Sequence, residues 1–183
     1  GRRAAEDFTA WRRAAGTPRP PQWAGLKFFN VYGPNEYHKG GQRSVALALF
    51  EQVRDSGRAR LFRSHHRDYA DGGQLRDFVW VEDCVDAVLT LWRQPKLSGL
   101  FNIGTGQARS FLDLAHAVFA AMDRPVAVDW IDTPAAIRER YQYFTEARVD
   151  RLRAAGFAAP FTSLERGVYR YVTEYLSTTD PYR

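Results

Sequence analysis

Short apolar runs of strand length alternate with longer segments of helical periodicity, and this alternation constrains the fold of the 183-residue chain more than any other feature. Strands that alternate with helices favour an α/β fold with parallel strand pairing. No internal repeat or low-complexity tract interrupts the pattern. The expected strands are residues 26–31, 60–62, 76–81, 100–103 and 126–130, and the expected helices are residues 2–14, 43–56, 82–94, 110–122, 146–155 and 162–176.

Several of these elements carry local signals for their faces and ends. Because side chains alternate along a strand, Phe78 and Trp80 should lie on one face of the sheet and Val79 on the other. Ser110 is a favoured N-cap residue and predicts the start of the helix that follows it. Gly57 predicts the end of the helix before it, since glycine adopts the left-handed conformation that closes a helix.

The segments between these elements are polar or rich in glycine. Residues 32–42 are expected to form a loop. Gly104-Thr-Gly106 predicts a tight turn, and not a phosphate cradle, because it lacks the third glycine of the dinucleotide fingerprint. Thr145 predicts the cap of the helix over 146–155, and Thr162 or Ser163 that of the last helix.

The composition argues against several classes of partner. The net charge is +5, but basic residues are scattered among acidic ones, so no nucleic-acid partner is expected. No apolar run approaches the ~18 residues that span a bilayer, so no membrane partner is expected. The single cysteine, Cys84, excludes an internal disulfide and fits a reducing cytosol. Cys84 lies among valines and is predicted to be an inert core residue.

The densest polar segment runs from Asn30 to Gly40, directly after an expected strand. Ligand sites of α/β sheets lie at the carboxyl ends of strands. Asn30 offers a bidentate amide, and Tyr32 and Tyr37 offer amphipathic walls; composition alone favours the alternative, a solvated loop with a Gly-Pro turn. Only three of the 26 basic residues are lysines, and Lys39 lies in this segment. A lysine where the chain otherwise uses arginine points to proton exchange, which a guanidinium does not perform.

A second polar segment contains two adjacent histidines, His65 and His66, near Asp68 and Asp71. This composition suggests a metal site. Adjacent side chains of an extended chain point to opposite sides, however, so one ion could not easily bind both histidines. No metal site is therefore expected.

The same segment carries arginines suited to a phosphate. Arg63, Arg67 and Arg76 flank a glycine-containing loop, and the guanidinium fork matches phosphate oxygens. The alternative for Arg76 is a salt bridge with Asp77 or Asp83.

Six motifs give the chain a family resemblance. Three of them resemble the second half of the extended short-chain dehydrogenase/reductase family of nucleotide-sugar enzymes: Leu26–Pro34, Arg76–Asp83 and Phe101–Gly106. The other three look like segments of its ADP-L-glycero-D-manno-heptose 6-epimerases: Asn35–Gly40, Arg140–Thr145 and Leu152–Gly156. The resemblance implies the C-terminal half of a Rossmann-type α/β fold, with a smaller α/β substrate-binding domain.

The resemblance also implies how this chain divides. The N-terminal cofactor half, with its glycine fingerprint and its Y-x-x-x-K pair, is expected to be missing. The Rossmann remnant would comprise residues 1–29, 79–104 and 146–160, and the substrate-binding domain residues 30–78, 105–145 and 161–183.

The implied reaction uses NADP to oxidise C6″ of an ADP-heptose to a ketone, which is then reduced from its other face. The implied setting is lipopolysaccharide inner-core synthesis in the cytoplasm of a Gram-negative bacterium, by a homo-oligomer, a pentamer in the family. This chain alone is expected to be inactive. The alternatives are another nucleotide-sugar epimerase or dehydratase, or a non-catalytic nucleotide-sugar-binding fragment.

Roles carried over from the family fall on positions that match its motifs. Lys39 matches a catalytic acid/base that also touches the cofactor, and Val31 matches a residue lining the nicotinamide. Gly41 stands where some members have a substrate-contacting serine. In the stretch 62–65 the sequence differs from the family, so backbone contacts are expected to persist there more than side-chain contacts. The matched substrate-binding residues are Asn30, Phe62, Arg63, Ser64, His65, Arg76 and Tyr141.

Overall fold

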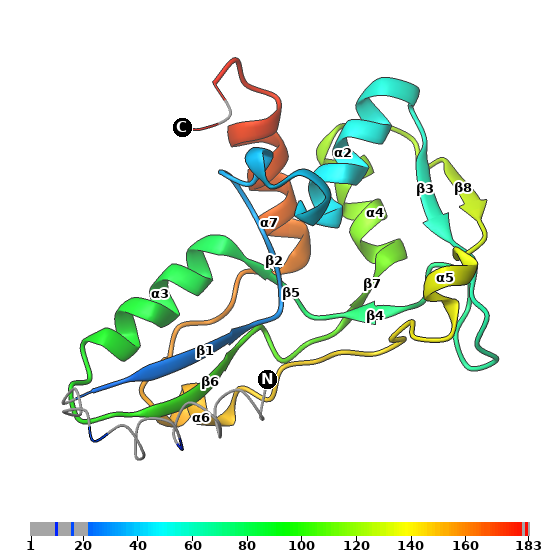
Figure 1. Cartoon of the computed structure of the whole chain (residues 1–183). Coiled ribbons are helices and arrows are strands. Elements are labelled where there is room, and N and C mark those ends of the chain that lie inside the picture. Colours follow the sequence, from blue (N-terminus) through cyan, green and yellow to red (C-terminus); the bar gives the residue numbers. More distant parts are fainter. Residues whose placement is uncertain (1–9, 11–15, 17–21, 181, 183) are drawn as a thin grey trace.

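The computed structural model describes residues 10, 16, 22–180 and 182. The expected helix over 2–14 lies outside the described residues, apart from residue 10. The described residues form an α/β fold with four two-stranded sheets (Figure 1). No helix among the described residues is long and apolar enough to cross a membrane.

Three of the four strand pairs are parallel, as the alternation of strands and helices predicts. The parallel pairs are β1 (Ala24–Phe28) with β6 (Gly99–Ile103), β2 (Asn30–Tyr32) with β5 (Phe78–Trp80), and β3 (Ala59–Phe62) with β8 (Val128–Ile131). The antiparallel pair is β4 (Leu75–Arg76) with β7 (Arg109–Ser110).

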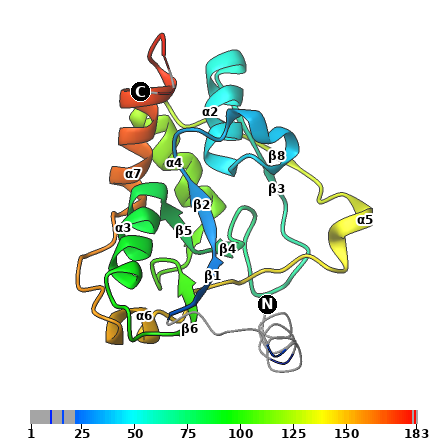
Figure 2. The same ribbon diagram turned by 60° about the vertical axis from the view of Figure 1, so that its left-hand side comes forward.

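The helices follow the strands along the chain and pack around them (Figures 1 and 2). They are the 3-10 helix η1 (Tyr37–Gln42), α2 (Val45–Ser56), α3 (Val81–Trp92), α4 (Phe111–Ala121), α5 (Ala135–Arg138), α6 (Asp150–Ala154), α7 (Leu164–Arg170) and the π-helix η2 (Tyr171–Leu176).

Two buried clusters form the core, and β5 separates them. Phe78 and Trp80 belong to the larger cluster, with α2, α4 and α7, whereas Val79 belongs to the smaller cluster with α3, β6 and α6. The predicted division of this strand between two faces is confirmed. Trp80 and Val79 are both 0% exposed, so β5 is buried on both sides.

Each of two expected strands is split in two, which the sequence did not predict. Residues 26–31 divide into β1 and β2 at Phe29, whose N–H donates to Ile103 O at 3.0 Å. The next N–H, that of Asn30, donates to Asp77 O at 3.0 Å. Neighbouring residues therefore pair with two different segments, and the expected strand over 76–81 is divided at Asp77 for the same reason.

Helix caps are predicted correctly in three places. Ser110 forms a capping box with Asp113 at the start of α4, Ser163 caps α7, and Gly57 closes α2 with φ of 72°. The predicted cap at Thr145 is wrong, because the Thr145 N–H donates to Leu75 O at 3.2 Å. This long-range pairing keeps the chain extended there, and α6 begins only at Asp150.

Candidate functional site

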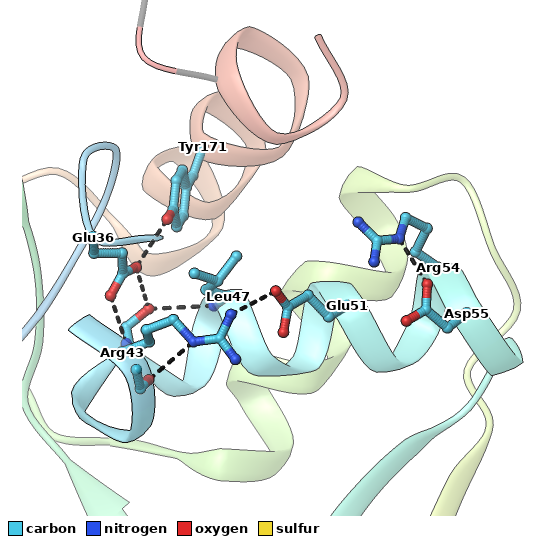
Figure 3. A network of polar contacts seen from close by, with 9 residues as sticks. Glu36, Arg43, Leu47, Glu51, Arg54, Asp55 and Tyr171 are labelled. Carbon is cyan, nitrogen blue, oxygen red and sulfur yellow. Dashed lines mark hydrogen bonds and ion pairs between the residues drawn. The ribbon is translucent and has the colours of Figure 1, made fainter. Parts of the chain in front are cut away.

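The segment that carries Lys39 is helical and firmly attached at both ends. Residues 37–42, expected to form a loop, form the 3-10 helix η1, which is broken by a kink at Gly40, where φ is 54°. Before it, the buried carboxylate of Glu36 accepts hydrogen bonds from Ser44 and from Tyr171 (Figure 3). After it, Arg43 donates to Gly40 O through both its N–H and its Nε. Four residues thus fix the ends of a six-residue segment.

Lys39 itself is exposed, and among the described residues its side chain forms no ion pair. Its backbone N–H donates to Glu36 O at 3.1 Å, which orients the turn. The geometry therefore presents an ammonium group on an anchored backbone, accessible to a ligand.

The other residues expected near Lys39 have mixed environments. Asn30 is exposed at the start of β2, and Val31 is half-buried against the smaller core cluster. Tyr32, expected as a wall of a ligand site, is 2% exposed and packs on Trp80 at 5.6 Å between ring centroids. That prediction for Tyr32 is wrong, because its ring packs inside the larger core cluster.

A cavity of about 460 Å³ opens between α2, β3, β8 and the segment that follows α5. Its surface is mostly apolar, with few polar groups, as in many sites for small molecules. The residues that line it are Val45, Gln52, Arg60, Leu61, Phe62, Gln74, Phe111, Ile131 and Tyr141.

Phe62 and Tyr141, both predicted to bind substrate, line this cavity, and Arg76 lies against one of its lining rings. Phe62 and Tyr141 meet edge to face, with 6.1 Å between ring centroids. The Arg76 guanidinium lies 5.5 Å from the Tyr141 ring centroid and 5.6 Å from that of Phe111. These contacts bring together residues from β3, β4 and the chain after α5.

Arg76 is the arginine of its segment that keeps its charge free for a ligand. Among the described residues it forms no salt bridge, whereas Arg63 lies near Asp71 and Arg67 pairs with Asp68 at 3.5 Å. Arg76 donates instead to the carbonyl oxygens of Leu75 and Gln142. Its half-burial lowers the pKa of the guanidinium, which stays far above neutrality.

The alternative of a salt bridge from Arg76 to Asp77 or Asp83 is wrong. Asp77 is 0% exposed, and Asp83 accepts hydrogen bonds from the N–H and the hydroxyl of Thr162, at 2.7 and 2.9 Å. Both carboxylates are therefore engaged elsewhere.

Asp77 explains why the glycine turn is not a phosphate site. Its carboxylate accepts hydrogen bonds from the N–H groups of Thr105, Gly106 and Ala147, at 2.7, 2.9 and 2.9 Å. The backbone N–H groups that could bind a phosphate therefore already bind an internal anion, the Asp77 carboxylate. Gly104-Thr-Gly106 is a structural turn, as predicted.

The four residues of the stretch 62–65 contribute to the site to different extents. Phe62 lines the cavity, but the Arg63 side chain is exposed and lies 3.8 Å from Asp132 and 4.0 Å from Asp71. The backbone N–H of Arg63 donates to Ile131 O at 2.8 Å, within the strand pairing.

The next two residues also use their N–H groups within the protein. Ser64 N–H donates to Asp71 at 2.7 Å, and His65 N–H donates to the Tyr143 hydroxyl at 2.7 Å. The carbonyl oxygens of Phe62 and Arg63 are engaged as well, since they accept from the Gly72 N–H at 3.1 Å and from the Thr133 hydroxyl at 3.3 Å.

Tyr141 belongs to an aromatic group that extends away from the cavity. Its ring centroid lies 5.5 Å from that of Tyr143, which in turn lies 5.1 Å from both His66 and Tyr69. Burial raises the pKa of the Tyr141 hydroxyl, while Arg76 opposes that rise and Tyr143 adds to it. Tyr141 is therefore a neutral hydrogen-bonding group at physiological pH.

Of the nine residues that line the cavity, sequence reasoning singled out only Phe62 and Tyr141; Gln74 and Phe111 are among the seven that it missed. Gln74 is 1% exposed and its amide N–H groups approach the carbonyl oxygens of Phe62 and Arg63, at 3.5 Å each. Phe111 directly follows the cap Ser110, which brings it to the ring contact with Arg76. Neither has a sequence signal, because both roles depend on contacts distant in the chain.

The remaining candidate groups have structural environments. Cys84 is buried, and burial raises the pKa of its thiol to about 12, with nearby Asp83 and Asp77 adding to the effect. It is therefore the inert core residue that the sequence predicts. Among the described residues, no group of three His, Cys, Asp or Glu could hold a metal ion.

The described residues fit one end of a nicotinamide cofactor. Val31 offers apolar surface suited to a ring, and Lys39 offers a positive charge suited to a phosphate. The turn at Gly104–Gly106 cannot cradle a pyrophosphate, since Asp77 already binds its N–H groups. The residues present thus fit an edge contact with such a cofactor.

Curated relatives with one name match most of the chain. The chain is 55% identical over 159 residues to the "ADP-L-glycero-D-manno-heptose-6-epimerase" of Nitratidesulfovibrio vulgaris (strain DP4), covering 87% of this chain and 49% of the relative. It is 45% identical over 170 residues to the protein of the same name from Fusobacterium nucleatum, covering 90% and 51%. The chain therefore spans about half the length of the curated relatives it matches.

Solved structures of similar proteins share the fold. The Helicobacter pylori ADP-L-glycero-D-manno-heptose-6-epimerase matches with a TM-score of 0.72 and 27% identity, covering 86% of this chain and 45% of that one. The Thermus thermophilus UDP-glucose 4-epimerase in complex with NAD matches with a TM-score of 0.69 and 23% identity, covering 90% and 48%. The model of the NAD dependent epimerase/dehydratase family matches residues 4–104. More than half of the sequence thus fits that model, and the chain belongs to the NAD dependent epimerase/dehydratase family.

Proposed function

We propose that this chain is the C-terminal part of an ADP-L-glycero-D-manno-heptose 6-epimerase, which inverts C6″ of ADP-D-glycero-D-manno-heptose. The observation that carries the proposal is the contact of the Arg76 guanidinium with Tyr141, which lines one apolar cavity together with Phe62. The 45–55% identity to relatives of that name supports the choice of substrate.

Arg76 and its ring partners are suited to holding the nucleotide end of such a substrate. A guanidinium without a carboxylate partner forms strong, bidentate contacts with phosphate oxygens. Phe62 and Tyr141 present flat apolar surface beside it, and the cavity gives that surface depth. We assign the diphosphate to Arg76, with Phe62 and Tyr141 beside it; Asn30, Arg63, Ser64 and His65 remain proposed substrate contacts.

Lys39 is assigned the proton chemistry at the other end of the substrate. Oxidation at C6″ removes a proton from O6″, and reduction from the opposite face returns one after the intermediate has turned. An acid/base group that is fixed on one side of the cofactor serves only one orientation of the substrate well. Two acid/base groups are therefore needed. Lys39 Nζ serves one orientation, and the tyrosine of the family's Y-x-x-x-K pair serves the other.

NADP, when bound, supplies the hydride chemistry at C6″, with no net oxidation. Val31 and Lys39 are the residues of this chain assigned to touch it. Because the sequence carries neither the glycine fingerprint nor the Y-x-x-x-K pair, this chain alone is proposed to be inactive. The proposed domain boundaries are those that the family resemblance implies in the sequence analysis. The proposed setting is lipopolysaccharide inner-core synthesis by a cytoplasmic homo-oligomer.

A substrate screen of the complete protein tests the proposal. With NADP present, ADP-D-glycero-D-manno-heptose should be converted to its C6″ epimer, as followed by proton NMR. UDP-glucose and UDP-galactose serve as matched nucleotide sugars and should not react. Conversion of a UDP-sugar at C4″, or tight binding of the ADP-sugar without turnover, would contradict the proposed function.

A further inference from the structure

Glu36 is a buried carboxylate to which the proposed reaction gives no role. Its side chain is 3% exposed, although the segment that follows it is open to solvent. Burying a carboxylate is costly unless hydrogen bonds replace its water. Figure 3 shows the carboxylate pointing toward Tyr171 on one side and toward the start of α2 on the other.

Three donors satisfy this carboxylate. Oε2 accepts from the Ser44 N–H at 2.5 Å, and Oε1 accepts from the Ser44 hydroxyl at 2.6 Å and from the Tyr171 hydroxyl at 2.8 Å. Ser44 also caps α2 by accepting from Leu47 N–H at 3.2 Å. Glu36 therefore joins three parts of the fold: the end of the polar turn after β2, the start of α2, and the C-terminal helix.

The two ends of the Lys39 segment meet at this carboxylate. Glu36 immediately precedes residues 37–42, and Ser44 follows them by two residues. Between them, Arg43 Nε donates to Gly40 O at 3.0 Å while Arg43 Nη1 pairs with Glu51 at 2.7 Å (Figure 3). The segment is thus a closed turn, and Lys39 lies on it.

Tyr171 connects this turn to the core. Its side chain is 1% exposed and contacts Trp80, with 6.1 Å between ring centroids. Burial raises the pKa of the Tyr171 hydroxyl far above its usual value, and the negative charge of Glu36 raises it further. The hydroxyl therefore stays protonated and remains a hydrogen-bond donor to Glu36 at any physiological pH.

We propose that Glu36, together with Ser44 and Tyr171, is a positioning residue for Lys39. The carboxylate touches neither substrate nor cofactor; it fixes the backbone of residues 37–42 so that Lys39 Nζ meets O6″ in one place. This inference rests on the proposed function. A displacement of about 1 Å can cost ~10²-fold in rate, so loosening the turn should lower turnover. Substrate affinity should persist, since Arg76 and its neighbours provide it.

The test compares Glu36→Gln and Tyr171→Phe in the complete protein, by steady-state kinetics and by hydrogen exchange of the backbone amides of residues 37–42. Both variants should exchange these amides faster. The kcat should fall roughly 10- to 100-fold for Glu36→Gln and less for Tyr171→Phe, with KM within about threefold of the original.

Asp83→Asn is the matched control. Asp83 is also a buried carboxylate that anchors a loop, through Thr162, and among the described residues it forms no hydrogen bond with residues 36–44. This variant should be less stable, and its kcat and its exchange at residues 37–42 should be unchanged.

The outcomes separate this inference from the proposed function. Faster exchange with an unchanged kcat, or unchanged exchange in both variants, would overturn the positioning role. If Glu36→Gln does not fold, Tyr171→Phe decides alone, because it removes a single hydroxyl and keeps the ring. An unaltered protein that does not turn over ADP-heptose would overturn the proposed function and, with it, the catalytic part of this inference.

Discussion

The guanidinium of Arg76 lies over the ring of Tyr141, 5.5 Å from its centroid, although the two residues come from distant parts of the chain. Tyr141 in turn meets Phe62 edge to face. A cation held over an aromatic ring keeps its N–H groups in a fixed plane. The pair therefore holds a guanidinium beside Tyr141, a residue that lines the apolar cavity.

The first prediction concerns this arginine. Arg76→Ala should raise the KM for the ADP-sugar and leave the affinity for NADP unchanged, because the guanidinium is assigned to the substrate diphosphate. Loss of a charge-assisted contact costs about 1.5–3 kcal/mol, which corresponds to roughly 10- to 150-fold in KM. Steady-state kinetics of the complete protein measures this. Arg76→Lys keeps the positive charge but loses the forked guanidinium, so its KM should lie between that of the original protein and that of Arg76→Ala. An unchanged KM in Arg76→Ala would refute the assignment.

The second prediction concerns stability. Asp77→Asn places an amide N–H₂ group where the carboxylate now accepts from three backbone N–H groups and one hydroxyl. At least one buried donor then lacks an acceptor, and the free energy of unfolding should fall by about 2–4 kcal/mol. Urea denaturation of the complete protein measures the loss.

Asp129→Asn is the control for this stability measurement. Asp129 pairs with Arg58 on the surface, and solvent screens such a pair, so its removal should hardly change the free energy of unfolding. Equal effects of the two substitutions would show that the bonds of Asp77 do not hold the turn in place.

The third prediction concerns pH. The Arg170 guanidinium holds the pKa of Glu82 below its usual range; burial opposes this and a hydrogen bond from Trp80 adds to it. A carboxyl whose pKa is lower in the folded state stabilises the fold above its unfolded pKa, ~4.3. That contribution disappears as the pH falls through the folded pKa.

The measurement is the unfolding midpoint of the original protein and of Glu82→Gln as a function of pH. The difference between them should be constant above about pH 5 and should shrink on acidification below about pH 4. It should be small and sensitive to salt, because the Glu82 side chain is 47% exposed. A difference that stays constant down to about pH 2 would rule out this ion pair as its source.

The fourth prediction concerns the cofactor. This chain alone should not bind NADP tightly, since its candidate contacts, Val31 and Lys39, reach only one end of such a molecule. Calorimetric titration of NADP into the purified chain measures this, with the complete protein as the positive control. A dissociation constant below about 1 μM for the chain alone would contradict the assignment.

Local signals predict much of this fold because they depend on neighbours in sequence. Alternation separates Phe78 and Trp80 from Val79, and the caps at Ser110 and Ser163 need only a hydroxyl in the right place. The division at Phe29 was not predictable, because it depends on Ile103 and Asp77 as separate acceptors.

In the candidate site, too, contacts between residues distant in sequence could not be predicted. The resemblance singled out Phe62, Arg76 and Tyr141 one by one, and the structure shows that they meet. Gln74 carries no such signal, because a buried glutamine beside a cavity has no pattern in sequence. The role proposed for Glu36 was equally hidden, since it depends on Tyr171 at the other end of the chain.

The central claim is that Lys39 exchanges a proton with the substrate, and Lys39→Arg tests it most directly. Arginine keeps the positive charge but does not exchange protons near neutral pH. We predict that kcat for C6″ inversion of ADP-D-glycero-D-manno-heptose falls ~10²–10⁴-fold in Lys39→Arg, the usual contribution of a positioned acid/base, with NADP affinity retained. A near-normal kcat in Lys39→Arg, together with only weaker binding in Lys39→Ala, would contradict the claim and make Lys39 a fixed charge.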